Sequence, residues 1–316
     1  MAILFAYLMV VLIWATTPLT IQWSGDSISF MAGVALRMSL ALALGMLVNL
    51  LLSRPSLFSY PGSWKVYAVA SIGIFPNMPV VYWSAQAIPS GLVAVIFAMS
   101  PFVTGVMSLL ILRENPFSPK RLLALLLALL GLALIFHDQW RLDVRAALGV
   151  LGILFSSLMF SLSSVWLKKL NTSLPAFDQA VGALLFAVPG LLLLWWLVDG
   201  SFAVAPSTRT AAAIVYLAVF GSLLGFTLFF YVLKKLSASA VSLITLMTPV
   251  LAVILGALAA GERLTLAALG GALLVLLALA LYVDWRFGRW FERALARTSL
   301  TDNSLEDLKE EFVRYK

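Results

Sequence analysis

The chain of 316 residues has no cysteine and one histidine, and only 11% of its residues are charged. The missing cysteines exclude disulfides, thiolate metal ligands and a cysteine nucleophile. The lone histidine, His137, does not belong to a metal-ligand motif, so we expect neither a metal nor a cofactor. Soluble domains carry roughly 25% charged residues. The low charge therefore excludes an ordinary soluble protein.

Apolar sequence fills the chain instead, with 62% hydrophobic residues and a mean hydropathy of +1.04. The apolar runs are long and lack two-residue alternation, which excludes a transmembrane barrel and leaves helices. A span needs about 20 residues, so we predict an all-α integral membrane protein with ten transmembrane helices. The predicted spans are 3–22, 30–52, 65–87, 90–112, 119–137, 146–167, 177–198, 210–233, 239–260 and 265–285.

One pattern occurs twice, at positions 148 residues apart. Met99-Ser100-Pro101 followed by Glu114 matches Met247-Thr248-Pro249 followed by Glu262. Each copy lies at the same place in one half, so the ten spans divide into two five-helix repeats. Because five is odd, the second repeat enters the membrane upside down. Inverted repeats predict a midplane cavity between the halves and transport by alternating access.

The repeats are expected at residues 1–137 and 146–285, followed by a cytoplasmic amphipathic tail at 286–316 that lies on anionic lipid. Lysine and arginine residues are more numerous in the loops on one side of the predicted membrane spans. With the N-terminus inside, the inner loops hold nine of these residues and the outer loops hold four. This bias places both termini in the cytoplasm. The basic residues are scattered over helix ends, so no nucleic acid binding is expected.

Carboxylates are absent from the interior of all ten predicted spans. Carriers driven by protons or sodium usually depend on a buried carboxylate, so the sequence favours facilitated export or exchange. The chain also lacks a Walker sequence and any buried constellation of acid, base or metal ligands. We therefore expect neither ATP hydrolysis nor enzyme activity.

The chain resembles the EamA-type transporters of the drug/metabolite transporter superfamily over roughly residues 3–285. The resemblance rests on Leu12-Ile13-Trp14-Ala15, on Arg113-Glu114 and Gly261-Glu262 after the proline helices, and on Gly131 and Gly270-Gly271. Arg113 departs from the usual glycine, and Trp14 has no tryptophan counterpart in the sixth span. The resemblance implies a multi-pass carrier of the inner (plasma) membrane that moves metabolites such as amino acids, often outward.

Asn77 lies between Pro76 and Pro79, close to the middle of the third predicted span. Two prolines three residues apart remove backbone donors and predict a broken helix that lines a cavity. Asn77 would then offer a donor and an acceptor to substrate. The alternative is a proline kink in which Asn77 bonds to a neighbouring helix.

Pro101 and Pro249 are expected to kink the fourth and ninth spans at equivalent points. With Pro76 and Pro79, they are candidate hinges or gates. The alternative is a static kink, in which Ser100 and Thr248 bond the carbonyls that the prolines free.

Arg37 lies roughly two turns inside the second span, where a charged side chain is costly. Its planar fork suits a substrate carboxylate. Two turns is also within reach of the outer interface, so snorkelling is the favoured alternative.

Trp14 and Tyr82 are the aromatic residues that we assign to the substrate site, and Ser161 and Thr245 are the hydroxyl residues. Aromatic side chains in bundles more often belong to packing or to interface belts. Small hydroxyl residues more often allow close helix packing, so both alternatives stay open.

The leading hypothesis is a secondary transporter that exports or exchanges small metabolites, such as amino acids or other amphipathic solutes, through a cavity between the repeats. A lipid-linked or glycolipid flippase and a non-transporting membrane scaffold or sensor are the alternatives. The expected partners are a small-molecule substrate and membrane lipid. The sequence leaves open a homodimer, the substrate, the direction of transport, any coupling ion and the role of the tail.

Overall fold

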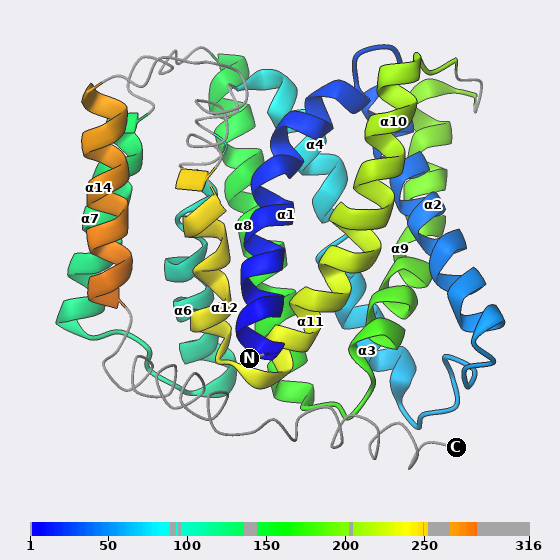
Figure 1. Ribbon diagram of the computed structural model, residues 1–316, viewed down its shortest axis with the longest axis horizontal. Helices are drawn as coiled ribbons and strands as arrows, with labels where there is room; N and C mark the ends of the chain where they lie inside the picture. Colours follow the sequence, from blue (N-terminus) through cyan, green and yellow to red (C-terminus); the bar gives the residue numbers. More distant parts are fainter. Residues whose placement is uncertain are drawn as a thin grey trace, which may run out of the picture.

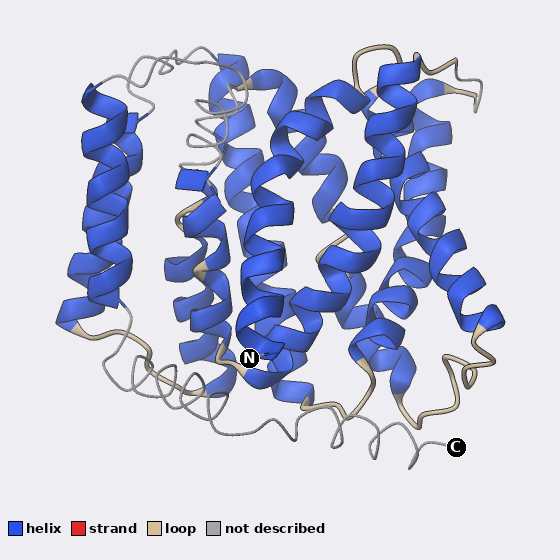
Figure 2. Cartoon of the chain, in the orientation of Figure 1, coloured by secondary structure: helices blue, strands red, loops and turns tan. Residues whose placement is uncertain are grey.

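The computed structural model describes residues 2–88, 93, 96–135, 144–201, 205–248, 250–251 and 266–282. Every regular element in these ranges is a helix (Figure 2), so the predicted all-helical class is confirmed. Pro249, Glu262 and the predicted tail at 286–316 lie outside the described residues.

Several helices are long and apolar, as the composition requires. Four described stretches are long and apolar enough to cross a membrane: Phe30–Leu51, Val144–Leu170, Ala176–Asp199 and Thr208–Lys235. The elements are α1 (Ala2–Ser24), α2 (Phe30–Leu51), α3 (Ser63–Ser71), α4 (Asn77–Ala87), α6 (Ser100–Leu112), α7 (Pro119–Ile135), α8 (Val144–Leu170), α9 (Ala176–Asp199), α10 (Thr208–Tyr216), the π-helix η2 (Leu217–Leu224), α11 (Gly225–Lys235), α12 (Ala238–Ser242) and α14 (Leu266–Tyr282).

The outer surface of the bundle is apolar. Leu126 and Leu130 of α7 and Leu193 of α9 are about 60% exposed, and many other large apolar side chains are similarly open. A soluble protein rarely presents contiguous apolar surface on this scale. This surface is the one expected to face lipid.

Contacts between distant segments fix the helix directions. The Tyr7 hydroxyl of α1 donates to the Ala240 carbonyl of α12 at 3.1 Å. The Thr210 hydroxyl of α10 donates to the Trp23 carbonyl at 3.1 Å. Helix α1 therefore begins beside α12 and ends beside the start of α10, an arrangement visible in Figure 1.

The two ends of the bundle differ in charge. We call one the basic end, because Arg54, Lys168 and Lys234 lie there, close to the end of α8 and the start of α9. Helices α2 and α9 lie side by side and are joined at both ends. At the basic end, Arg54 Nη2 is 2.9 Å from Asp178 Oδ1. At the opposite end, the Ser29 hydroxyl donates to the Asp199 carboxylate.

The packing of the helices is the same when each is exchanged for its counterpart 148 residues away. Helix α1 packs on α11 as α8 packs on α4, and α2 packs on α4 as α9 packs on α11. Helices α2 and α9, and likewise α7 and α14, each pack with their own counterparts.

Helices α7 and α14 pack closely on one another at one side of the bundle (Figure 1). A Cβ atom at Gly131 would lie 2.6 Å from the Gly271 carbonyl oxygen, so only glycine permits this approach. Arg121 near the start of α7 lies over the Tyr282 ring at the end of α14, at 5.5 Å. The two helices are therefore antiparallel.

Candidate substrate site

The third predicted span is broken, as the two prolines indicated. Helix α3 ends at Ser71 and α4 begins at Asn77, with the cis peptide bond Phe75–Pro76 in between. Pro76 directly precedes α4, and Pro79 lies in its first turn. Backbone N–H groups in the first turn of a helix have no partner within the helix, so proline, which lacks this group, is tolerated there. The prolines therefore separate two helices rather than kink one.

Asn77 is 2% exposed and holds the break together. Its Nδ2 atom donates to the Gly73 carbonyl at 2.8 Å, and its Oδ1 atom accepts from the Ser156 hydroxyl of α8. The two alternatives for Asn77 therefore occur together: the helix is broken, and the Asn77 side chain bonds to a neighbouring helix. The carbonyl freed by the break is satisfied by this side chain.

The equivalent segment of the second half is irregular too. Subtracting 148 from the bounds of α11 gives 77–87, the bounds of α4. The residues before α11 form η2, in which the Gly225 amide donates to the Phe220 carbonyl five residues earlier. Such π-helical turns are rare and frequently occur at functional sites. No feature of the sequence predicted this one.

Arg37 of α2 lies between η2 and α4, the helix that follows the break. It is 2% exposed, its Nε atom donates to the Ser222 hydroxyl of η2 at 2.8 Å, and its Nη1 atom donates to the Tyr82 hydroxyl of α4 at 3.1 Å. The favoured prediction of snorkelling is therefore wrong. Counting turns from the helix end gave the depth of Arg37, but not the face of α2 on which it lies.

The partners of the Arg37 guanidinium are neutral. Buried charges are normally paired with an opposite charge. Among the described residues, the measured ion pairs are Arg54 with Asp178 and Arg209 with Asp26, both at helix ends. A guanidinium has five N–H donors, and the two bonds to Ser222 and Tyr82 use two of them. Three N–H donors of the Arg37 guanidinium therefore remain for a further acceptor.

Trp14 lies in an aromatic cluster beside the same irregular segment. Its ring stacks on Phe229 of α11 at 5.2 Å and meets Phe160 of α8 edge-on at 5.9 Å. A Cβ atom at Gly225 would lie 3.0 Å from Trp14 Nε1, so the absence of a side chain at Gly225 gives the indole its place. The cluster forms an apolar wall that joins α1, α8 and α11.

The hydroxyl candidates lie in packing contacts. Ser161, fully buried, pairs with Thr104 at 2.9 Å, which joins α8 to α6. The Thr245 hydroxyl donates to the Ser242 carbonyl, three residues earlier, at 2.7 Å. Arg37 and Tyr82 are thus in direct contact, whereas the bonds of Ser161 and Thr245 lead to other parts of the bundle.

The hydroxyl groups of Ser100 and Thr248, each next to a proline, form different hydrogen bonds. Ser100 pairs with Ser157 of α8 at 2.9 Å, so the expectation that it bonds a carbonyl freed by Pro101 is wrong. Pro101 lies at the start of α6 rather than inside it. The Thr248 hydroxyl donates to the Thr245 carbonyl at 3.2 Å, as that expectation requires.

Ser222 and Phe229 are site residues that the sequence did not reveal. A lone serine and one phenylalanine of a phenylalanine pair give no signal in an apolar chain. The repeat offset was the one available clue, because it aligns Gly221 with Gly73 and Gly225 with Asn77.

Comparison with known proteins accounts for this duplicated architecture. The model of the EamA-like transporter family matches residues 1–137 and again residues 147–283. The chain belongs to this family. As an EamA-like transporter, within the drug/metabolite transporter superfamily, it is a multi-pass membrane transporter rather than an enzyme.

Two relatives of this EamA-like transporter are themselves named as transporters. An uncharacterized transporter of Archaeoglobus fulgidus is 25% identical over 278 residues, covering 86% of this chain and 95% of the relative. The uncharacterized transporter YoaV of Bacillus subtilis is 26% identical over 272 residues, covering 84% and 91%. A solved protein structure superposes with a TM-score of 0.73 at 17% identity, covering 94% of this chain and 98% of the other, which shows a shared fold.

Proposed function

We propose that this EamA-like transporter is a secondary carrier that exports or exchanges small carboxylate-bearing metabolites, such as amino acids, by alternating access. The observation that carries the proposal is the buried Arg37 guanidinium, which has only neutral hydrogen-bond partners among the described residues and lies between η2 and α4. A carboxylate would supply the missing negative charge and match the planar fork.

The proposed framework is ten spans in two inverted five-helix repeats, 1–137 and 146–285, followed by a cytoplasmic tail at 286–316. The exchangeable packing pairs support it, and so do the opposite directions of the counterpart helices α2 and α9, and of α7 and α14. The basic end would face the cytoplasm of the inner membrane, with both termini on that side, because positive residues favour cytoplasmic loops.

Eight of the ten candidate residues have a proposed role. Arg37 holds the carboxylate, and the Tyr82 hydroxyl, which Arg37 already contacts, orients the guanidinium. The Trp14 cluster faces the apolar part of the solute. Pro76, Pro79 and Asn77 define the break at which α4 moves relative to α3, while Pro101 and Pro249 are hinges in their own spans.

Transport is proposed to be uncoupled from ion gradients. The acids in the described residues are Asp26, Glu114, Asp178 and Asp199, and all lie at helix ends or in loops. A coupling proton or sodium ion would need a carboxylate inside the bundle. Exchange or facilitated export needs none.

Counterflow in proteoliposomes tests the proposal. A labelled panel of amino acids and other small carboxylates should accumulate above empty vesicles, and the corresponding amides, which lack the carboxylate, should compete poorly. Arg37→Gln should weaken carboxylate transport by about 10- to 100-fold, the loss expected for a hydrogen bond to a charged group. Arg37→Lys should retain part of the carboxylate transport.

Arg209→Gln is the matched control. Arg209 is exposed and forms a 3.7 Å ion pair with Asp26, and such surface pairs contribute little. Size-exclusion chromatography establishes that each variant is folded. If no carboxylate moves above empty vesicles, or if Arg37→Gln still prefers carboxylates over their amides, the proposal fails.

A further inference from the structure

A second cationic site lies at the basic end, away from Arg37. A pocket of about 50 Å³ opens between the end of α8, the start of α9 and the end of α11. Its polar and aromatic lining consists of Lys168, Asn171, Thr172, Gln179, Phe230 and Lys234, and two leucines complete it. Drug-sized ligands need several hundred Å³, so this pocket suits one compact group.

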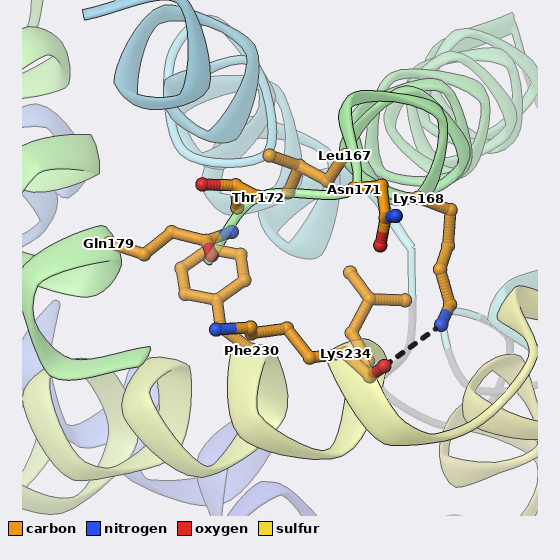
Figure 3. Close-up of a pocket in the computed structure, with 8 residues that line it drawn as sticks. Leu167, Lys168, Asn171, Thr172, Gln179, Phe230 and Lys234 are labelled. Atoms are coloured by element: carbon orange, nitrogen blue, oxygen red, sulfur yellow. Dashed lines mark hydrogen bonds between the residues drawn. The ribbon is translucent and has the colours of Figure 1, made fainter. Parts of the chain in front are cut away.

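The two lysines give the pocket its charge. Lys168 Nζ donates to the Lys234 carbonyl at 3.3 Å (Figure 3), and Lys234 Nζ donates to the Leu174 carbonyl. An ammonium has three N–H donors, so each lysine retains two for a ligand. The described residues that line the pocket include no aspartate or glutamate.

The Gln179 side chain has a buried oxygen that lacks a hydrogen-bond donor. Its side chain extends from α9 toward the Phe230 ring (Figure 3) and the residue is 1% exposed. Its Oε1 atom has no hydrogen-bond partner. A buried acceptor without a donor is costly. A ligand that presents an O–H group to Gln179 and negative oxygens to the lysines would satisfy both.

We propose that this pocket binds a phosphate group that carries or adjoins a hydroxyl. Lysine is a common phosphate ligand as a point charge. Hydrogen phosphate in solution and the headgroup of an anionic lipid with a free hydroxyl share this chemistry. The site is independent of the carboxylate proposed to bind at Arg37, so either can be correct without the other.

Calorimetric titration of the full-length protein in nonionic detergent distinguishes the two sources. One arm uses inorganic phosphate, and the other uses short-chain dihexanoyl phosphatidylglycerol, with the phosphatidylcholine analogue as its neutral reference. Saturation by phosphate alone identifies a soluble ligand. Saturation by phosphatidylglycerol, but not by the reference, identifies a lipid headgroup. Either result supports the site if it depends on the pocket residues.

The neighbouring lysines provide matched controls. Lys234→Gln and Gln179→Met should each weaken binding by about tenfold or more, whereas Lys235→Gln and Lys169→Gln, which alter lysines outside the lining, should bind as the parent does. Lys234→Arg keeps the charge and should retain binding, which separates charge loss from misfolding. Failure of both probes to saturate, equal losses in the control variants, or wild-type affinity in Lys234→Gln would overturn the proposal.

Discussion

The third span and its counterpart in the second half bend at the same place by different means. In the first half, Pro76 ends the hydrogen-bond ladder and Asn77 takes up the freed Gly73 carbonyl. In the second half, the chain stays helical and widens into η2, whose last bond runs from Gly225 to Phe220. The shared feature is therefore the backbone irregularity and its position, rather than the residues that cause it.

The two segments also differ in what they face. The closest atoms to a Cβ built at Gly73 are at 3.5 Å, and include Ser163 of α8. The same construction at Gly221 places the Cβ 3.0 Å from the Arg37 guanidinium. A symmetric frame thus holds an asymmetric site, with a charge beside one bend and a neutral packing contact beside the other.

Asn77→Ala should give the largest effect on this comparison, because it removes the side chain that closes the first break. The Gly73 carbonyl and the Ser156 hydroxyl would lose their bonds, at about 1–3 kcal/mol each. We expect a clear fall in thermal midpoint in detergent, together with reduced transport. Ser156→Ala removes one of the two bonds. Its thermal midpoint should lie between those of Asn77→Ala and the parent. An unchanged midpoint for Asn77→Ala would show that the break holds itself together.

Tyr82→Phe should have a smaller effect, confined to the contact between α4 and Arg37. Position 82 aligns with Phe230 in the second half, so the change makes the halves alike there. It removes the hydroxyl that accepts from Arg37, at about 1 kcal/mol. We expect a several-fold rise in the KM for carboxylate solutes at a similar thermal midpoint. A KM equal to that of the parent would remove Tyr82 from the site.

The paired changes Gly221→Ala and Gly73→Ala should give the smallest effects and the cleanest contrast. At Gly221 the new methyl displaces the end of the Arg37 side chain by a few tenths of an ångström, whereas at Gly73 it makes ordinary contacts. We expect transport of carboxylates to fall about threefold or less in the first variant, and to stay unchanged in the second. Equal effects in both would argue that the two bends are functionally equivalent.

The sequence predicted the helical class and the broken third span for physical reasons. Lipid forces the backbone to satisfy its own hydrogen bonds, which makes long apolar runs helical. Two nearby prolines cannot continue a helix, so the break at 72–76 could be predicted from Pro76 and Pro79 alone.

The partners of the buried charge could not be predicted in the same way. Arg37 and Ser222 are 185 residues apart, and Tyr82 is 45 residues from Arg37. Their meeting depends on how η2 and α4 pack against α2. A π-helical turn leaves no periodic mark in a uniformly apolar stretch, so η2 became visible only with the fold.

The ties at both ends of α2 and α9 have a mechanical consequence. Because Arg54 binds Asp178 at one end and Ser29 binds Asp199 at the other, these helices form a strut braced at its two extremities. A pair of helices tied at both ends resists splaying. In the proposed alternating-access cycle, the remaining helices would therefore tilt about this pair, with the irregular segments before α4 and α11 as the joints.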